Sequence, residues 1–251
     1  ADDTTDDSTK EETKDESRDE SKKDDRELIS EFVEEFITYE GLLKSYQDPE
    51  NGNTYLELSD EDISKEFIYF AHIINGTVEA GLFKGSHIDQ AVIKFEKQFN
   101  SLNLVRVNTE YYFDPDSELS RQSQSNISDS VIENFEITHK NEDENTYLID
   151  ITKLLKSDNL TKLKSEPRDY ESDSFGVGSL SRSKTAISKI YNYPNNTDFE
   201  VDYVFSNPAS YESLRNTSVK LRYTFLEMPQ DNGFEIRFED PRIGYFTDRV
   251  T

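Results

Sequence analysis

The stretch Phe199-Glu200-Val201-Asp202-Tyr203-Val204-Phe205-Ser206 decides the fold class of this chain. Its large apolar side chains at positions 199, 201, 203 and 205 alternate with the polar residues Glu200, Asp202 and Ser206. The same period of two recurs in residues 219–225 and 234–238. This alternation predicts antiparallel strands that place one face in the core and the other in solvent.

Turn signals and apolar runs predict further strands upstream. The turn Asp48-Pro49-Glu50-Asn51-Gly52-Asn53 separates two extended runs, which is a strong hairpin signal. Residues 67–74 form a continuous apolar run, short enough to be a strand buried on both faces. Further strands are expected at residues 91–96 and 102–107, around 135–137 and at 147–151, which brings the total to about nine to eleven.

The helices expected from the sequence are few and short. Apolar residues recur at helical spacing from Leu28 to Ile37, which predicts an amphipathic helix that docks on the sheet, with Asp24 or Asp25 as its N-cap. Ser59 and Asp62 have the spacing of a capping box for one helical turn. Two further short or broken helices are expected, one around Ile127, Val131 and Ile132, and one at Leu154, Leu155, Leu160 and Leu163.

The expected fold is therefore mainly β (α+β), either an antiparallel sandwich or a strongly curved sheet with two or three short helices. Residues 1–26 are set apart by composition, because the first 25 contain twelve acidic and five basic residues and no apolar side chain beyond Ala1. Such a segment cannot bury a core and is interpreted as a disordered acidic tail or tether. Residues 27–251 form the β-rich domain, with sub-boundaries considered near 114–130 or 165–178.

Charge and composition restrict the function classes. The 251 residues have a net charge of -25, which disfavours nucleic acid and anionic membrane as partners, because phosphates attract clustered Lys and Arg. Cysteine is absent from the sequence, which excludes disulfides, thiolate metal sites and a Cys nucleophile. No apolar run approaches the roughly 20 residues of a membrane-spanning helix.

The histidines and two acidic turns are the candidates for metal binding and acid–base chemistry. His72, His87 and His139 are far apart in sequence and fit no H-E-x-x-H helix. His72 is interpreted as a satisfied core residue, and the other two as solvated residues at strand edges. Two acidic turns, at residues 48–53 and 114–118, offer oxygen ligands but lack the spacing of a calcium loop, and Asx-turn chemistry explains both.

Three further motifs have structural explanations. Ser181-Arg182-Ser183-Lys184 matches the S-x-x-K motif of acylating serine enzymes, but its S-D-N and K-T-G partners are missing, so a polar turn is expected. Gly176-Val177-Gly178 lacks the third glycine of a phosphate-binding loop. The tyrosine pairs 111–112 and 191/193 could stack on sugars, although core packing is the default for such residues. No catalytic, cofactor-binding or metal residue is therefore assigned.

Four stretches, taken in order, resemble the region that precedes the catalytic domain in a family of large bacterial zinc-dependent, metzincin-like metalloproteases. They span roughly residues 36–251 and are Tyr39–Leu58 with Gly41-Leu42-Leu43-Lys44, Phe67–Glu96 with Gln90-Ala91-Val92-Ile93-Lys94-Phe95-Glu96, Ser181-Arg182-Ser183 through Tyr193-Pro194-Asn195-Asn196, and Asp240–Thr251. In that family, two regions of unknown function precede the protease domain.

The resemblance implies that the parent protein is an exported zinc metallopeptidase, and that this chain is its non-catalytic, N-terminal or propeptide-like part. Zinc is then expected in the protease domain, which is also the expected partner. The run Asp240–Thr251 is interpreted as a junction at which the chain is cut before that domain. Asp240 and Asp248 leave a carboxylate-based latency switch open.

The N-terminal residues bear on where the protein is located. The start at Ala1 and the acidic tract suggest an exported protein, either periplasmic, an outer-membrane lipoprotein with its lipid anchor upstream of Ala1, or extracellular. The alternative function is a β-rich binding module of the cell envelope that recognises glycan or protein.

Overall fold

The computed structural model describes residues 28–111, 128–163, 177–206, 216–229 and 233. Their strands form one 12-stranded antiparallel sheet in the order β1-β2-β3-β8-β7-β6-β5-β4-β12-β11-β10, and β9 pairs with β11 beyond the end of β10. The strands are β1 Ile37–Tyr39, β2 Ser45–Gln47, β3 Thr54–Ser59, β4 Glu66–Asn75, β5 His87–Gln98, β6 Ser101–Arg106, β7 Ser130–Asn141, β8 Thr146–Asp150, β9 Ser179–Leu180, β10 Ala186–Tyr193, β11 Asn196–Ser206 and β12 Asn216–Glu227.

The helices of the described residues are single turns. They are α1 (Ile29–Phe32), the 3₁₀ turn η1 (Val78–Ala80) and α3 (Thr152–Leu155). None of them has the length and apolar character needed to cross a membrane. The mainly β, antiparallel fold with short helices is therefore confirmed, in the form of one curved sheet that does not close into a barrel.

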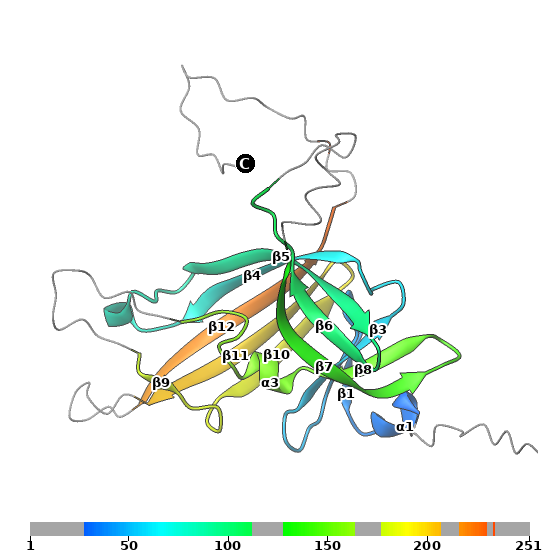
Figure 1. Cartoon of the computed structure of the whole chain (residues 1–251). Coiled ribbons are helices and arrows are strands. Elements are labelled where there is room, and N and C mark those ends of the chain that lie inside the picture. Colours follow the sequence, from blue (N-terminus) through cyan, green and yellow to red (C-terminus); the bar gives the residue numbers. More distant parts are fainter. Residues whose placement is uncertain (1–27, 112–127, 164–176, 207–215, 230–232, 234–251) are drawn as a thin grey trace, which may run out of the picture.

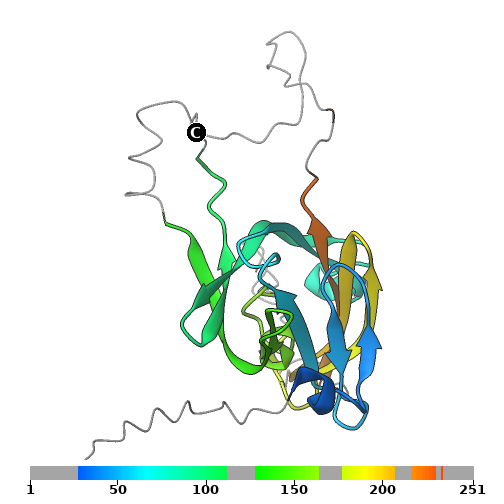
Figure 2. The same cartoon turned by 90° about the vertical axis from the view of Figure 1, so that its right-hand side faces the viewer.

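The sheet curls around the segment that contains α3, as Figures 1 and 2 show. The inner side chains of nearly every strand join one core, which also contains Leu154, Leu155, Leu160 and Leu163 from this segment. We call residues 152–163 the inner plug. The expected broken helix at these leucines is confirmed, since only α3 forms a helical turn there.

Three buried tyrosines attach the inner plug to the sheet. The hydroxyl of Tyr203 on β11 lies 2.5 Å from the carbonyl oxygen of Leu155 and 3.0 Å from that of Ser157, and 2.7 Å from the hydroxyl of Tyr223 on β12. Tyr69 on β4 hydrogen-bonds to Thr161. Because buried backbone carbonyls need hydrogen-bond donors, the Tyr203 hydroxyl between the carbonyls of Leu155 and Ser157 helps to bury an irregular segment inside the curl.

A second, smaller core lies on the outer face of the sheet, beneath α1. Ile29 and Val33 pack there on Tyr46 of β2 and Leu148 of β8, with Phe32, Phe36 and Tyr55 at the periphery. The docking of this segment on the sheet agrees with the expectation, but the helix is shorter than expected. It ends at Phe32, and Ile37 enters β1 opposite Gln47, because pairing with β2 replaces further helical turns.

Three other expectations from local sequence are wrong. Residues 67–74 are not buried on both faces, because Phe67, Tyr69, Ala71 and Ile73 point into the core while the residues between them are only half-buried. Val131 and Ile132 lie in β7, paired with β6, and not in a helix. Ser59 does bond Asp62 through its backbone amide and hydroxyl, but residues 60–62 form a turn and not a helix.

Other sequence expectations fall outside the described residues. They concern the tail 1–26, the acidic turn 114–118, Ile127, the strand at 234–238 and the junction Asp240–Thr251. Sub-boundaries were expected near residues 114–130 or 165–178. The strands before and after each of these ranges belong to the same sheet and contribute to the same core.

The first and last strands of the sheet approach each other along a seam, where β1 and β2 lie beside β10 in Figure 2. Asn192 on β10 donates from Nδ2 to the carbonyl oxygens of Tyr39 (2.8 Å) and Leu43 (2.7 Å). Its Oδ1 accepts a bond from Thr197 Oγ1 at 2.6 Å. The Leu42 amide also donates to the Tyr193 carbonyl at 2.8 Å. We call these contacts the Asn192 clasp.

Gly41 is required because the backbone at this position lies very close to Asn192 and Tyr193 in the clasp. A Cβ at this position would lie 2.1 Å from Asn192 Oδ1 and 2.8 Å from the backbone nitrogen of Tyr193. Both distances are shorter than van der Waals contact, so any side chain here would push the two edges of the sheet apart.

We expect Asn192→Ala to lower the free energy of unfolding by about 1–3 kcal/mol, because it removes the Nδ2 bonds to the Tyr39 and Leu43 carbonyls and the acceptor of the Thr197 hydroxyl. The measurement is urea unfolding followed by circular dichroism. Asn195→Ala, an exposed position three residues away, is the matched control and should have little effect.

Gly41→Ala should also destabilise the chain, and its cost should be smaller in the Asn192→Ala background, because removal of the amide relieves part of the clash. Additive effects of the two substitutions would show that the clasp does not couple these positions.

Candidate functional site

The candidate functional features of the described residues lie on the outer face of the sheet, because the core and the inner plug occupy the inner face. Two ionic clusters on this face each contain a buried carboxylate. The first surrounds Glu57 on β3, and the second surrounds Arg222 on β12.

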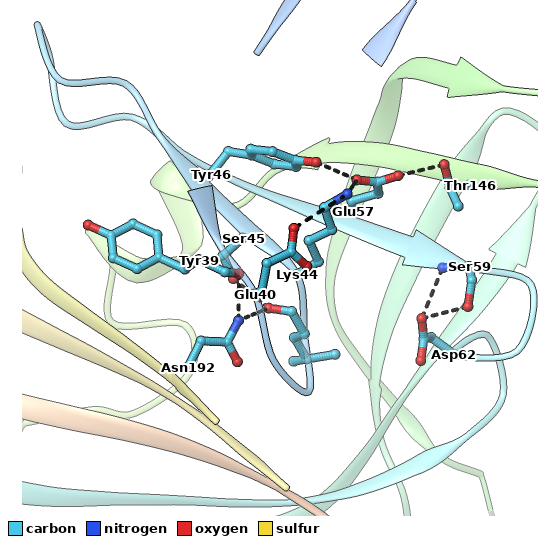
Figure 3. Close-up of polar contacts among 11 residues, drawn as sticks. Tyr39, Glu40, Lys44, Ser45, Tyr46, Glu57, Ser59, Asp62, Thr146 and Asn192 are labelled. Carbon is cyan, nitrogen blue, oxygen red and sulfur yellow. Dashed lines mark hydrogen bonds and ion pairs between the residues drawn. The ribbon is translucent and has the colours of Figure 1, made fainter. Parts of the chain in front are cut away.

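Glu57 is the centre of the first cluster, drawn in Figure 3. Its Oε2 accepts a hydrogen bond from Tyr46 OH at 2.6 Å and lies 3.0 Å from Lys44 Nζ. Its Oε1 accepts a bond from Thr146 Oγ1 at 2.8 Å. The Glu57 side chain is only 7% exposed, and a buried carboxylate requires hydrogen-bond partners. Both of its oxygens have them.

These contacts shift the pKa values of the cluster. Burial alone would raise the pKa of Glu57, but the hydrogen bonds from Tyr46 and Thr146, together with Lys44, outweigh burial and lower it. Burial and the bond to Glu57 raise the pKa of Tyr46 to about 12. Burial alone would lower the pKa of Lys44, but hydrogen bonds with Tyr46 and Glu57 raise it. At neutral pH, the cluster therefore holds a carboxylate, an ammonium and a neutral phenol.

The second cluster crosses β10, β11 and β12. Arg222 Nη2 and Nε lie 2.5 and 3.2 Å from Glu200 Oε1, and Arg222 Nη1 is 3.8 Å from Asp198 Oδ2. The guanidinium also lies over the ring of Tyr191, at 5.3 Å from its centroid. The sequence predicts that Glu200 lies on a solvated face, but its side chain is only 5% exposed, because Arg222 covers it.

His72 lies next to the second cluster, directly opposite Arg222 on one side and His87 on the other. This places it on the outer face and corrects its interpretation as a satisfied core residue. Its Nδ1 is shielded from solvent and has no hydrogen-bond partner among the described residues. Burial and the neighbouring Arg222 lower the pKa of His72, so the ring is neutral at pH 7.

The other two histidines have different surroundings. His87 is exposed, whereas His139 is half-buried beneath α1, where its ring stacks on Phe32 at 4.1 Å between centroids. The solvated strand edge expected for His139 is therefore wrong, because α1 covers that part of β7. Within the described ranges, no three His, Cys, Asp or Glu residues are placed to share a metal ion.

Ser181 and Lys184 lie in a turn between β9 and β10. The Ser181 carbonyl accepts bonds from the amides of Lys184 and Thr185 at 3.1 Å each, and the Thr185 hydroxyl donates to it at 3.0 Å. Lys184 Nζ donates to Asn216 Oδ1 at 3.2 Å. The lysine is thus engaged with a side chain on β12.

The acidic turn at residues 48–53 is stabilised by its own hydrogen bonds. Asp48 Oδ1 accepts from the Glu50 amide at 2.8 Å, Asp48 Oδ2 accepts from Asn51 Nδ2 at 2.5 Å, and Asn51 Oδ1 accepts from the Asn53 amide at 2.8 Å. This is the Asx-turn chemistry that the sequence predicts.

The tyrosines and the glycine pair singled out from the sequence have the following surroundings where the structure describes them. Tyr191 carries Arg222 on its ring, while Tyr193 and Tyr111 are about half exposed, at 51% and 46%. Val177 is buried in the main core, and Gly178 follows it with φ of 90°. Tyr112 and Gly176 are outside the described residues.

A shallow depression of about 270 Å³ lies at the ends of β6 and β7. It is lined by Arg106, Val107, Asn108, Thr109, Glu110, Ser128 and Ser130. Arg106 is engaged at its edge by Asp89, at 3.1 and 3.2 Å. Neither serine has a lysine or histidine among the lining residues to activate it.

Comparison with known proteins gives one match. The family model DUF5117, a domain of unknown function, matches residues 85–251, which is more than half of the chain. No curated protein and no solved structure matches.

We expect Glu57→Gln to lower the free energy of unfolding at pH 7 by about 1–3 kcal/mol, because Lys44, which is partly exposed, and Tyr46 lose the charge of a buried carboxylate. Since the folded-state pKa of Glu57 is lowered, its contribution is fully present above the ordinary glutamate pKa and is lost as the pH falls through the folded-state value.

The measurement is chemical unfolding of both proteins between pH 3 and 7, roughly the range that brackets glutamate titration. The two stability curves should converge toward the acid end. Glu61→Gln, at an exposed position in the next turn, is the matched control. A difference between wild type and Glu57→Gln that stays constant with pH would contradict the ionic role of Glu57.

Proposed function

The chain belongs to the DUF5117 family, a domain of unknown function, and we propose that it is the non-catalytic, N-terminal or propeptide-like region of an exported bacterial zinc metallopeptidase. It would pack on the protease domain of the same polypeptide and support or regulate it. The parent would be periplasmic, an outer-membrane lipoprotein or extracellular, and its zinc would be bound by the protease domain.

One observation carries this proposal. Two stretches that resemble the metalloprotease family, Gly41-Leu42-Leu43-Lys44 and Tyr193-Pro194-Asn195-Asn196, meet at the Asn192 clasp although about 150 residues separate them. Their contacts are backbone and amide hydrogen bonds that hold two sheet edges together, and Gly41 is needed for steric reasons. Motifs of this kind maintain the shape of a domain, as expected of a scaffold that acts by contact.

The ionic clusters support the same interpretation. The charged groups of Glu57 and Arg222 are held by neighbours within their own clusters, which fixes the outer face in one conformation. A fixed outer face lowers the entropic cost of docking another domain. The net charge of -25 favours a partner surface with basic side chains.

The test is to express the remainder of the parent polypeptide with and without this chain. We expect the two to co-purify, and the remainder to be soluble and able to cleave a protein substrate only when it has been folded with the chain. Zinc measured by mass spectrometry should amount to about one ion in the remainder, and the purified chain should contain none.

Ser181→Ala is the matched control, and it should support the remainder as well as the wild type does. Failure of the chain to associate, with unchanged solubility and activity of the remainder, would refute the proposal. Loss of activity with Ser181→Ala in a folded chain would instead point to chemistry at that serine.

A further inference from the structure

Phe99 occupies an unusual position at the turn between β5 and β6. Gln98 pairs with Ser101, so Phe99 and Asn100 alone form the turn. The Phe99 residue is 93% exposed, the largest exposed fraction among the exposed large hydrophobic residues described. A large aromatic ring is thus presented almost entirely to solvent.

The backbone of Phe99 is also strained. Its φ is +55°, in the left-handed region, while Asn100 is not among the residues with positive φ. A two-residue hairpin turn with positive φ at its first central position normally has glycine there. A bulky side chain in this conformation is rare, and such strain persists only where surrounding contacts impose it.

A network of polar side chains imposes this conformation. Ser101 Oγ donates to the Gln98 carbonyl at 2.8 Å, and Asn103 Nδ2 donates to Gln98 Oε1 at 3.1 Å. Asn134 Nδ2, from β7, lies 3.0 Å from Ser101 Oγ and 2.6 Å from Asn103 Oδ1. The turn is therefore tied to two strands, and this fixes the backbone from which Phe99 projects.

The residues around the turn define the chemistry of the partner. The network itself is uncharged, although about a third of the chain is charged. Charged groups appear at its border, where Glu136 pairs with Ser101 and Glu96 pairs with Asn103. Two cations lie near the turn, and both have partners. Lys94 is engaged by Glu96 at 2.9 Å and Asp129 at 3.0 Å, and Lys97, which precedes Gln98, donates to the Tyr147 hydroxyl at 2.6 Å.

An exposed aromatic surrounded by neutral polar groups, with charges at the rim, is typical of a protein–protein interface. Carboxylates at the rim favour basic side chains on the partner. Anionic lipid is disfavoured as the partner, because membrane association of this kind depends on clustered Lys and Arg.

We propose that Phe99 is the anchor by which this chain docks into an apolar pocket, bordered by Lys or Arg, on the domain that follows it in the parent polypeptide. This inference rests on the proposed function and identifies the contact through which the two parts meet. The strain in the turn is retained because it holds the ring in the orientation that the pocket accepts.

The first arm of the test separates strain from docking, and it uses the isolated chain. Phe99→Gly removes both the ring and the strain, so its melting temperature should rise by about 2–6 °C. Phe99→Ala removes the ring but keeps a Cβ at positive φ, so its melting temperature should stay close to that of the wild type. A fall in melting temperature with Phe99→Gly would overturn the claim of strain.

The second arm locates the partner in the intact parent protein. The photo-crosslinking residue benzoylphenylalanine replaces Phe99, and in separate proteins it replaces Phe83 or Tyr193, which are each about half exposed. After irradiation, mass spectrometry should map cross-links from position 99 to a segment of the following domain that contains apolar residues and Lys or Arg. Position 83 should give far less of this product.

The outcomes distinguish the two proposals. Cross-links to the following domain from position 83 or 193 but not from 99 would leave the proposed function standing and overturn the role of Phe99. The absence of such cross-links from all three positions would count against both. A link from position 99 to a second copy of the chain, or to lipid, would also overturn the inference.

Discussion

The structure depends on how an open antiparallel sheet covers its own apolar inner face. The sheet curls around residues 152–163, whose leucines join the main core. An irregular segment brings polar groups into this core. The Tyr203 hydroxyl bonds its carbonyls, Tyr69 bonds Thr161, and Tyr223 supports Tyr203 from the neighbouring strand. Burial raises the pKa of each of these tyrosines, so they remain neutral donors.

Curling brings the two edges of the sheet together and creates the seam. An uncovered edge would expose unpaired backbone groups and invite aggregation. Here the Asn192 side chain spans the gap, supported by a backbone bond from Leu42 to Tyr193. The outer face carries two ionic clusters, and the burial of Glu57 and Glu200 within them fixes that face. The fold therefore presents a preformed surface, which agrees with a role in supporting another domain.

The strands were the best predicted part of the fold, and the local exceptions have physical causes. The alternation around Phe199 and Val219 places these residues in the core, as predicted. The prediction of a helix at Val131 and Ile132 was wrong, because a short apolar run fits a helix or a strand equally well. The strand that pairs with this run, β6, lies about 25 residues earlier in the chain. Glu57 and Phe99 were overlooked, since a glutamate in an alternating strand and a phenylalanine near a turn give no local sign of burial or strain.

The sequence by itself determined that this protein is an antiparallel β structure, with one apolar face on the strands whose residues alternate, because the period of two is a local property of the chain. Its composition also determined the strong negative charge and the absence of thiol chemistry. Only the tertiary structure decided the curl, the inner plug, the Asn192 clasp and the strained turn at Phe99. Each of these depends on contacts between residues distant in sequence or on a backbone angle imposed by neighbouring strands, and neither is encoded in a local pattern.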